Sequence, residues 1–517
     1  MKNFFIIFLQ MICFNLAIGQ VYNVTSFQKI NDVNGDLYIS LDNDDWFGHA
    51  VESIGDLNGD GISDVIVSAL QDDDGAFNVG AIYVLFLNSN GAVSSFQKIS
   101  AIEGEFNGQM EEWDYFGRSL SYLGDINSDG FIEIAVGAEY DGDGGYRHGA
   151  VWILSLTESG NVNSYQKISD TQGGFTGVLD VWDVFGSDIA NIGDLNNDGN
   201  IDIAVGARRD GDGGDERGAV WVLFLNSDFT VNSHQKISDT QGDFEAPLSY
   251  KDYFGGSVTN IGDLDNDGVI DLAVGAYRDN DGGINKGAVY ILFMNIDGTV
   301  KAYQKISETE GDFNETLEED SLFGVSIDLT QDINGDGKTE IIIGCGNYNG
   351  QNDRIGFFYI LNLNSDGKVD SFQKYSDGLM GFDGELVEGD FFGYSVSTMI
   401  EDGLNYSFII GAFGDSENGY RKGAAWVIKL GLILSIEDLN TPNNIFLYPN
   451  PTRNAFSLSD ITNVNTIQVF DMLGREVLSF NSVKSNQFNV AYLPVGEYII
   501  NVVTEKGSIS SYKLIKE

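Results

Sequence analysis

The sequence predicts an all-β fold, a six-bladed propeller closed by an N-terminal strand and followed by a small C-terminal β-sandwich. Two observations predict the propeller: a repeat of 69 residues fills most of the 517-residue chain, and every copy contains short strand-like segments. A third observation, a set of short strands after the repeats end, predicts the sandwich. The repeats lack the periodicity that would indicate helices.

Two landmarks define the repeat. A Phe-Gly pair begins every copy at intervals of 69 residues, at positions 47, 116, 185, 254, 323 and 392. A Gln-Lys-Ile/Tyr tripeptide keeps the same interval, at positions 28, 97, 166, 235, 304 and 373. We therefore expect six structurally equivalent units within residues 21–432.

The fourth copy illustrates how one unit divides into strands. Residues 254–261, 272–276 and 288–294 are three strand-like runs, and the tripeptide at 304–306 belongs to a fourth. An acidic loop, 263–271, separates the first two strands. Four strands in a unit of this size are typical of a propeller blade.

The two ends of the repeat region predict how the ring closes. The region opens with a single fourth-type strand at 27–30, and it ends near Leu430 after the third strand of the last copy. The first strand can therefore complete the last blade and leave no open sheet edge between the first and last repeats. A linear solenoid is the alternative, but it would leave both ends incomplete.

One acidic pattern, Asp-x-Asp/Asn-x-Asp-Gly-x-x-Asp/Glu, follows the first strand in five copies. Its side chains place oxygen atoms at positions 1, 3, 5 and 9, and the residue at position 7 would offer its main-chain carbonyl. The predicted metal ligands are Asp56, Asn58, Asp60, Ile62 and Asp64; Asp125, Asn127, Asp129, Phe131 and Glu133; Asp194, Asn196, Asp198, Asn200 and Asp202; Asp263, Asp265, Asp267, Val269 and Asp271; and Asp332, Asn334, Asp336, Lys338 and Glu340.

These loops predict about five Ca²⁺ ions that act mainly as a structural clamp. Calcium takes about six to eight oxygen ligands in flexible geometry, whereas Mg²⁺ demands stricter geometry. Zinc would require His or Cys, which the loops lack. Asp, Asn and Gly also favour plain turns, but the recurrence of the same oxygen positions in five loops favours calcium. The sixth copy, 401–405, is two residues short and is expected to bind no ion.

The charge of the chain excludes some classes of partner. Asp and Glu number 78 against 28 Lys and Arg, which gives a formal charge of −50. Such a field repels nucleic acid and anionic membrane surfaces, so we expect neither as a partner. The acid excess has two interpretations, a solubilising surface or carboxylates gathered around cations, and the loop spacing supports the second.

Residues 1–20 have the features of a secretory signal peptide, including an apolar run at 4–14. The run is too short to span a bilayer, and no later segment qualifies, so no transmembrane segment is expected. Cys13 falls within this signal. Cys345 occupies a position that Ala holds in sister repeats, so we expect a small buried side chain there.

The repeats resemble the FG-GAP repeats of the integrin α-subunit propeller. The matching features are the Phe-Gly pair, the acidic loop and a Val-Gly-Ala tripeptide at 136–138, 205–207 and 274–276. The resemblance covers about residues 21–430. It implies a propeller that binds Ca²⁺ in these loops and serves adhesion or ligand binding, although integrin rings have seven blades and only six copies are visible here.

The periodicity stops near residue 430, and 433–444 has the composition of a linker. Residues 445–517 resemble the C-terminal sorting domain of the type IX (Por) secretion system. The matching motifs are LYPNPT at 447–452, FDMLGR at 470–475, LPVGEY at 493–498 and KLIK at 513–516. The resemblance implies the type IX secretion machinery as a partner and a protein that a Bacteroidetes-type bacterium secretes or attaches to the outside of its outer membrane.

We expect a protein for adhesion or ligand binding, with a protein or glycan as its ligand. The main alternative is a secreted propeller enzyme or carbohydrate-processing protein that acts on glycans, and a purely structural spacer is the third possibility. The acids recur in every repeat, whereas a catalytic site would break the symmetry in one, so we predict no enzyme activity.

The loops on the other side of the ring carry aromatic residues and Asp-Gly runs. These residues have two interpretations, a ligand surface or aromatic rings that pack beneath turns, and for any single residue the second is favoured. The recurring Lys of the fourth strands is expected to discourage pairing at an exposed sheet edge. The aromatic residues of these loops are Trp46, Trp113, Trp182 and Tyr253, and the aspartates are Asp141, Asp143, Asp210, Asp212, Asp279 and Asp281. The lysines of the fourth strands are Lys29, Lys98, Lys167, Lys236, Lys305 and Lys374.

Overall fold

Strands are the regular elements throughout the described part of the chain, which confirms the all-β prediction. None of these residues forms a helix of the length and apolarity that crossing a bilayer requires. Tyr22–Gly431 form one compact unit, and the described residues beyond them belong to another. The computed structural model describes residues 22–346, 355–399, 406–432, 447–448, 452–458, 464–471, 475–481, 483–484, 486–504 and 509–516.

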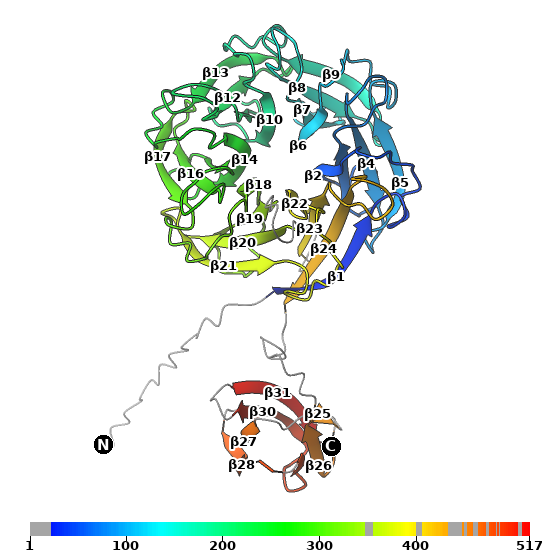
Figure 1. Ribbon diagram of the computed structural model, residues 1–517, viewed down its shortest axis with the longest axis vertical. Helices are drawn as coiled ribbons and strands as arrows, with labels where there is room; N and C mark the ends of the chain where they lie inside the picture. The colour runs from blue at the N-terminus through cyan, green and yellow to red at the C-terminus, as the bar shows by residue number, and fades with distance from the viewer. Residues whose placement is uncertain are drawn as a thin grey trace, which may run out of the picture. The chain divides into compact units, whose positions relative to one another are not determined.

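The first five repeats each fold into a four-stranded antiparallel sheet with its strands in chain order. The first strand of each sheet lies nearest the centre of the ring and the fourth lies at the rim (Figure 1). The first strands are β2 (Phe47–Gly55), β6 (Phe116–Gly124), β10 (Phe185–Asn191), β14 (Phe254–Gly262) and β18 (Phe323–Leu329). The second strands are β3 (Asp64–Ala69), β7 (Ile132–Ala138), β11 (Ile203–Ala207), β15 (Asp271–Ala276) and β19 (Thr339–Cys345). The third strands are β4 (Ala81–Leu87), β8 (Ala150–Leu156), β12 (Ala219–Leu225), β16 (Ala288–Met294) and β20 (Phe357–Leu363). The fourth strands are β5 (Val93–Ile99), β9 (Val162–Ile168), β13 (Val231–Ile237), β17 (Val300–Ile306) and β21 (Val369–Tyr375).

The last sheet joins the two ends of the repeat region. It contains β22 (Ser395–Met399), β23 (Tyr406–Ala412) and β24 (Ala424–Leu432), and its fourth strand is the N-terminal strand β1 (Tyr22–Ile30). The Thr25 hydroxyl donates a hydrogen bond to the Lys429 carbonyl across this pair, at 3.2 Å. The N-terminal strand thus closes the ring as predicted, and the first and last repeats share no open edge (Figure 1).

The recurring Phe-Gly pair and the Gly before each third strand hold neighbouring sheets together. Gly149 forms a parallel bridge with Phe185 of the next sheet, and the Phe185 side chain is fully buried. A Cβ atom on Gly149 would lie 2.0 Å from the Phe185 carbonyl oxygen, so a larger residue would force the sheets apart. Equivalent bridges join Phe47 to Gly423, Gly218 to Phe254, Gly287 to Phe323 and Gly356 to Phe392.

The apolar core lies between neighbouring sheets. Phe254 at the start of β14 stacks on Phe244 of the preceding loop, with ring centroids 4.8 Å apart. Cys345 is completely buried, as expected, and burial raises the pKa of its thiol. The tryptophans of the third strands, Trp152, Trp221 and Trp426, are also buried in the core.

The C-terminal unit contains two antiparallel sheets. One has β25 (Leu447–Tyr448), β26 (Ala455–Leu458) and β29 (Gln487–Asn489), and the other has β28 (Glu476–Asn481), β27 (Val464–Asp471), β30 (Gly496–Thr504) and β31 (Ile509–Lys516). Phe456 and Phe488 of the first sheet pack in the same apolar cluster as Ile467 and Ile500 of the second. The two sheets therefore share one core, as expected of a small β-sandwich.

Candidate metal centres and the opposite loop face

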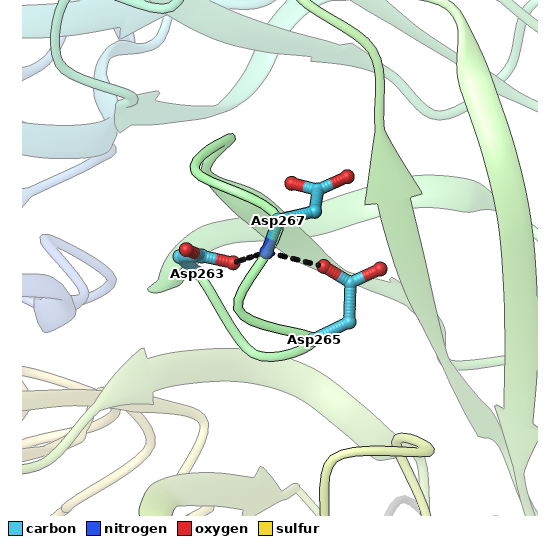
Figure 2. Close-up of side chains that lie close together, drawn as sticks. All are labelled: Asp263, Asp265 and Asp267. Carbon is cyan, nitrogen blue, oxygen red and sulfur yellow. Dashed lines mark hydrogen bonds between the residues drawn. The ribbon is translucent and has the colours of Figure 1, made fainter.

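The five acidic loops share one pattern of internal hydrogen bonds. In the fourth loop, the Asp267 N–H donates to Asp263 Oδ1 at 2.9 Å and to Asp265 Oδ1 at 3.2 Å (Figure 2). The N–H groups of Gly268 and Val269 donate to the Asp263 and Asp267 carboxylates, at 2.8 and 2.9 Å. The other four loops make the same four bonds at positions 1, 3 and 5.

The local sequence explains this shape, because two residues of each loop adopt left-handed backbone conformations. In the fourth loop these are Asn266 at φ 61° and Gly268 at φ 91°. Gly and Asn tolerate such angles better than most residues. Positions 4 and 6 therefore fold the loop back, so that the side chains at positions 1, 3 and 5 gather on one side.

The carboxylate at position 9 holds the base of the loop. Asp271 is buried, and its two oxygens accept the N–H groups of Leu264 in the loop and Met294 in β16, at 2.9 and 3.0 Å. Asp64 and Asp202 make the same pair of bonds. Desolvation raises the pKa of these carboxyls to about 6 for Asp64, Asp202 and Asp271, and to about 7 for Glu340.

Two loops bring three carboxylates within 4.8 Å of one another. In the fourth loop these are Asp263, Asp265 and Asp267, and in the fifth they are Asp332, Asp336 and Glu340. Position 3 is Asn in the other four loops, and the fifth forms its triplet with the position 9 carboxylate; the first three form no such carboxylate triplet within the described residues. The donors are carboxylate and amide oxygens in all five loops, which suits a hard cation such as Ca²⁺. The carbonyls of position 7 remain predicted ligands.

The fourth loop contains a cation that sequence reasoning missed. The Lys301 ammonium, from β17, lies 2.6 Å from Asp265 and also pairs with Asp267. The equivalent residues of four sister repeats are Ser94, Asn163, Asn232 and Asp370. The only sign of this contact in the sequence is therefore a Lys at a position where those repeats have Ser, Asn or Asp. In the fifth loop the Lys338 ammonium lies 2.5 Å from Asp370 and makes only a longer contact, at 4.0 Å, with the loop carboxylate of Asp336. The shortened sixth loop, 401–405, lies outside the described residues.

The fourth-strand lysines correct one expectation. Lys167 is buried rather than exposed at an edge, and its ammonium lies 2.7 Å from Asp141 and 2.9 Å from Asp143 of the loop between the second and third strands. These aspartates are therefore ion-pair partners rather than free ligand groups. The same pairing joins Lys29 to Asp415, Lys98 to Asp72, Lys236 to Asp210 and Lys305 to Asp279, with second contacts to Glu417, Asp74, Asp212 and Asp281. Lys374 instead lies 3.7 Å from the ring centroid of Phe357.

The aromatic residues of this face divide into two groups. Tyr253 is buried in a small apolar cluster with Tyr277, as the packing interpretation expects. Trp46 packs against Phe413, with ring centroids 5.1 Å apart. Trp113, by contrast, is 41% exposed. This face therefore has both packed rings and rings available to a ligand.

The first strands surround a polar cavity of about 530 Å³ that sequence reasoning missed. The Glu52 carboxylate accepts the N–H of Tyr122 in the next sheet, at 2.9 Å. Asp188 and Asp328, which also line the cavity, each accept an N–H from the next sheet at 2.7 Å. These acids link neighbouring first strands around the ring. Desolvation raises the pKa of all three carboxyls, to about 7 for Asp188.

Two segments of the chain match known family models. Residues 47–85 match the FG-GAP repeat, and residues 446–517 match the secretion system C-terminal sorting domain. Both resemblances drawn from the sequence motifs are thereby confirmed.

Curated proteins similar to this chain include integrin α-subunits. Integrin alpha-PS5 of Drosophila melanogaster is 35% identical over 164 residues, which is 32% of this chain and 15% of the relative. Integrin alpha-6 of Gallus gallus is 34% identical over 164 residues, or 32% and 14% of the two chains. Integrin alpha-4 of Xenopus laevis is 32% identical over 163 residues, or 31% and 14%. The aligned segment thus spans about one seventh of the length of these relatives.

Proposed function

We propose that this chain, which joins FG-GAP repeats to a secretion sorting domain, is an exported calcium-binding protein that presents a ligand-binding surface. In this proposal residues 1–20 are the signal peptide, 21–432 the repeat ring, 433–444 a linker and 445–517 the sorting domain. The observation that carries the calcium part is the recurrence of the same hydrogen-bond pattern in all five acidic loops.

Calcium would complete each loop. The side chains at positions 1, 3 and 5 gather on one side of the loop, and the position 9 carboxylate lies at its base. Without a cation, carboxylates such as Asp263 and Asp265 repel each other, so binding is expected to stabilise the folded chain. We therefore propose about five Ca²⁺ ions as structural clamps between first and second strands.

Titration of the chelated mature protein tests this proposal. Calorimetry should record an uptake of about five Ca²⁺, and the melting temperature should rise as the loops fill. Mg²⁺ at the same concentration should stabilise the protein less, because it requires stricter geometry. If the protein neither takes up calcium nor melts at a higher temperature with it, the acidic loops are ordinary turns rather than calcium sites.

The sorting domain supports export. The family that matches residues 446–517 is described as a secretion system C-terminal sorting domain, and we propose the type IX machinery of a Bacteroidetes-type bacterium as its partner. A chain truncated after Leu432 should remain in the periplasm, whereas the full chain should reach the cell surface or the medium. Equal export of both chains would remove this part of the proposal.

We propose adhesion or ligand binding as the role of the ring, with a protein or glycan as the ligand. Its relatives are integrin α-subunits, and the acids of the repeats have the same metal-loop or ion-pair positions in one sheet after another. Binding to a glycan or protein panel without turnover would support this role. Release of products from a polysaccharide would instead favour the alternative, a secreted enzyme or carbohydrate-processing protein that acts on glycans.

A further inference from the structure

One arginine on the loop face opposite the acidic loops lies among aromatic rings. The Arg147 guanidinium lies 3.8 Å from the ring centroid of Tyr140, 4.1 Å from that of Trp182 and 5.1 Å from that of Tyr146. We call these four residues the Arg147 stack. Tyr140, Tyr146 and Arg147 come from the loop between the second and third strands of one sheet, and Trp182 comes from the loop that leads into the next.

The stack continues into further aromatic residues. Tyr140 stacks on Tyr115 with ring centroids 4.8 Å apart, and Trp113 contacts Phe77 at 4.9 Å. Trp113 also lies 6.1 Å from Tyr115. Tyr146 in the stack is 58% exposed, and Trp113 and Phe77 are exposed as well. Tyr146 in the stack, and Trp113 and Phe77 next to it, are therefore accessible to solvent.

The Arg147 guanidinium has no ion-pair partner among the described residues. This is unexpected on electrostatic grounds, because the chain has 78 acidic residues against 28 basic ones. Neighbouring arginines do find carboxylates: Arg208 pairs with Glu139 at 2.9 Å, and Arg209 pairs with Glu216. Ring stacking thus holds the Arg147 guanidinium in place, and its five N–H donors form no ion pair with a carboxylate among the described residues.

The fold does not require this arrangement. Residues needed for closure of the ring, such as the Phe-Gly pairs, recur in every repeat. The position of Arg147 varies: it is Asn78, Glu216 or Asn285 in three sister repeats and Arg354 in the fifth. The arrangement recurs where the ring closes, with Arg421 5.3 Å from the ring centroid of Tyr420 and 6.0 Å from that of Trp46. Arg421 likewise has no ion-pair partner among the residues that the structure describes. Such symmetry breaking is expected of residues that serve a ligand.

A stacked guanidinium presents its planar fork of N–H donors to an anion, and a carboxylate can accept two of them in parallel. Exposed aromatic rings beside it offer flat apolar surfaces of the kind that pack against the C–H face of a sugar ring. Both features together suit a sugar that carries a carboxylate. The charge of −50 opposes a long polyanion, so the site suits one acidic sugar at a time within a short oligosaccharide.

We propose that the Arg147 stack is a binding site for a carboxylated sugar residue of a glycan, with Arg147 on the carboxylate and the exposed Tyr146 against the sugar ring, while Trp182 holds Arg147 in place. This inference rests on the proposed ligand-binding function and names the chemistry of its ligand.

Calorimetric titration of the full mature chain in calcium buffer tests the site. The probes are trigalacturonate and sialyllactose, each compared with its neutral counterpart, methyl-esterified trigalacturonate and lactose. At least one acidic probe should bind, and its counterpart should bind at least tenfold more weakly. Arg147→Gln should weaken binding at least tenfold. Arg147→Lys should weaken it about fivefold or more, because it keeps the charge but loses the planar fork.

Lys368→Gln is the matched control, since it removes one positive charge from a turn on the acidic-loop side and should leave binding unchanged. Calcium uptake and melting temperature of Arg147→Gln should equal those of the parent chain, which separates a lost site from lost folding. Binding of neither acidic probe, or binding that Arg147→Gln leaves intact, would overturn the proposal.

Two other outcomes separate this inference from the proposed function. Equal binding of acidic and neutral probes would overturn carboxylate recognition and leave glycan binding standing. Arg147-dependent binding of a Glu-rich peptide, with no sugar bound, would overturn the sugar class and leave ligand binding by this face standing.

Discussion

The Lys301 ammonium lies 2.6 Å from a carboxylate oxygen of Asp265, within the fourth acidic loop. It also pairs with Asp267, so one side chain of the protein neutralises part of a proposed metal site. Any cation that enters this loop must displace the ammonium or share its partners. The fourth loop is therefore expected to be the weakest of the five in calcium affinity.

Replacing Lys301 should strengthen calcium binding. Lys301→Ser introduces the residue that the first repeat has at this place, Ser94, and removes the competing charge. We expect the weakest class of sites in a calorimetric titration to tighten several-fold, with the number of ions unchanged. Lys368→Ser, which removes a similar charge from a turn, should not alter the titration. An unchanged weakest class in Lys301→Ser would show that the ammonium does not compete.

Removing one loop carboxylate should cost more stability with calcium than without it. Asp263→Asn keeps one oxygen that can accept the Asp267 N–H. It removes a charge from the cluster and the second oxygen, which accepts the Gly268 N–H. In calcium the variant should bind about one ion fewer and melt at a lower temperature than the parent chain. In chelator the drop in melting temperature should be smaller, because the reduced repulsion among the loop carboxylates offsets part of the lost Gly268 hydrogen bond.

Asp297→Asn is the matched control for that prediction. Asp297 lies in the turn after β16 of the same repeat, where its carboxylate accepts hydrogen bonds from Thr299. The number of bound ions should be unchanged in this variant. Loss of an ion from Asp297→Asn would mean that general surface charge, rather than the loop, governs uptake.

The ion pair of Lys167 with Asp141 should contribute strongly to stability. Lys167→Met leaves the buried Asp141 carboxylate without its partner, and removal of one member of a buried pair typically costs about 3–5 kcal/mol. Urea denaturation measures the change in the free energy of unfolding. Lys368→Met, at a half-exposed pair with Asp312, should cost less than about 1 kcal/mol. Adding Asp141→Asn to Lys167→Met should recover part of the loss, and no recovery would argue against an electrostatic cause.

The Asp188 carboxyl should make stability depend on pH. Desolvation raises its pKa to about 7 in the folded protein, although the Val258 N–H and Arg118 offset part of the effect. The folded chain thus holds this proton more tightly than the unfolded chain. Its contribution is complete below about pH 4, the usual pKa range of Asp, and is lost as the pH rises through about 7.

Asp188→Asn should remove this dependence, because the amide keeps an oxygen for the Val258 N–H and has no proton to lose. One pKa unit corresponds to about 1.4 kcal/mol, so between pH 5 and 8 the parent chain should lose roughly 2–4 kcal/mol relative to the variant. Urea denaturation at fixed calcium concentration measures the difference. Asp228→Asn, at an exposed turn, should follow the parent chain, and parallel curves for all three proteins would contradict the assignment to Asp188.

The acidic loops and the ring closure could be predicted because their determinants are close in sequence. All the oxygens of one loop fall within nine residues, as from Asp263 to Asp271, and glycine or asparagine marks the turns. Closure followed from counting strands, since a single strand at the start matches the one missing at the end.

Interactions between residues far apart in sequence could not be predicted in this way. Asp141, the partner of Lys167, lies 26 residues earlier in the chain. No local pattern connects the two, so the sequence alone suggests only that the periodic Lys discourages pairing at a sheet edge. Glu52 reaches Tyr122 at a separation of 70 residues, across the boundary between two sheets. Such contacts depend on how neighbouring sheets lie around the centre of the ring, which no local pattern encodes.

The sequence by itself determined the all-β fold, the repeat unit, the five oxygen-rich loops and the sorting domain, because each depends on residue types at short or strictly periodic spacing. The tertiary structure alone decided which charges are neutralised inside the protein and which remain free. Lys301 enters a metal loop, and Arg147 meets Trp182 of the next sheet without an acidic partner among the described residues. Both depend on side chains from separate strands or sheets meeting in space, where burial and Coulomb energy act on distance rather than on sequence separation.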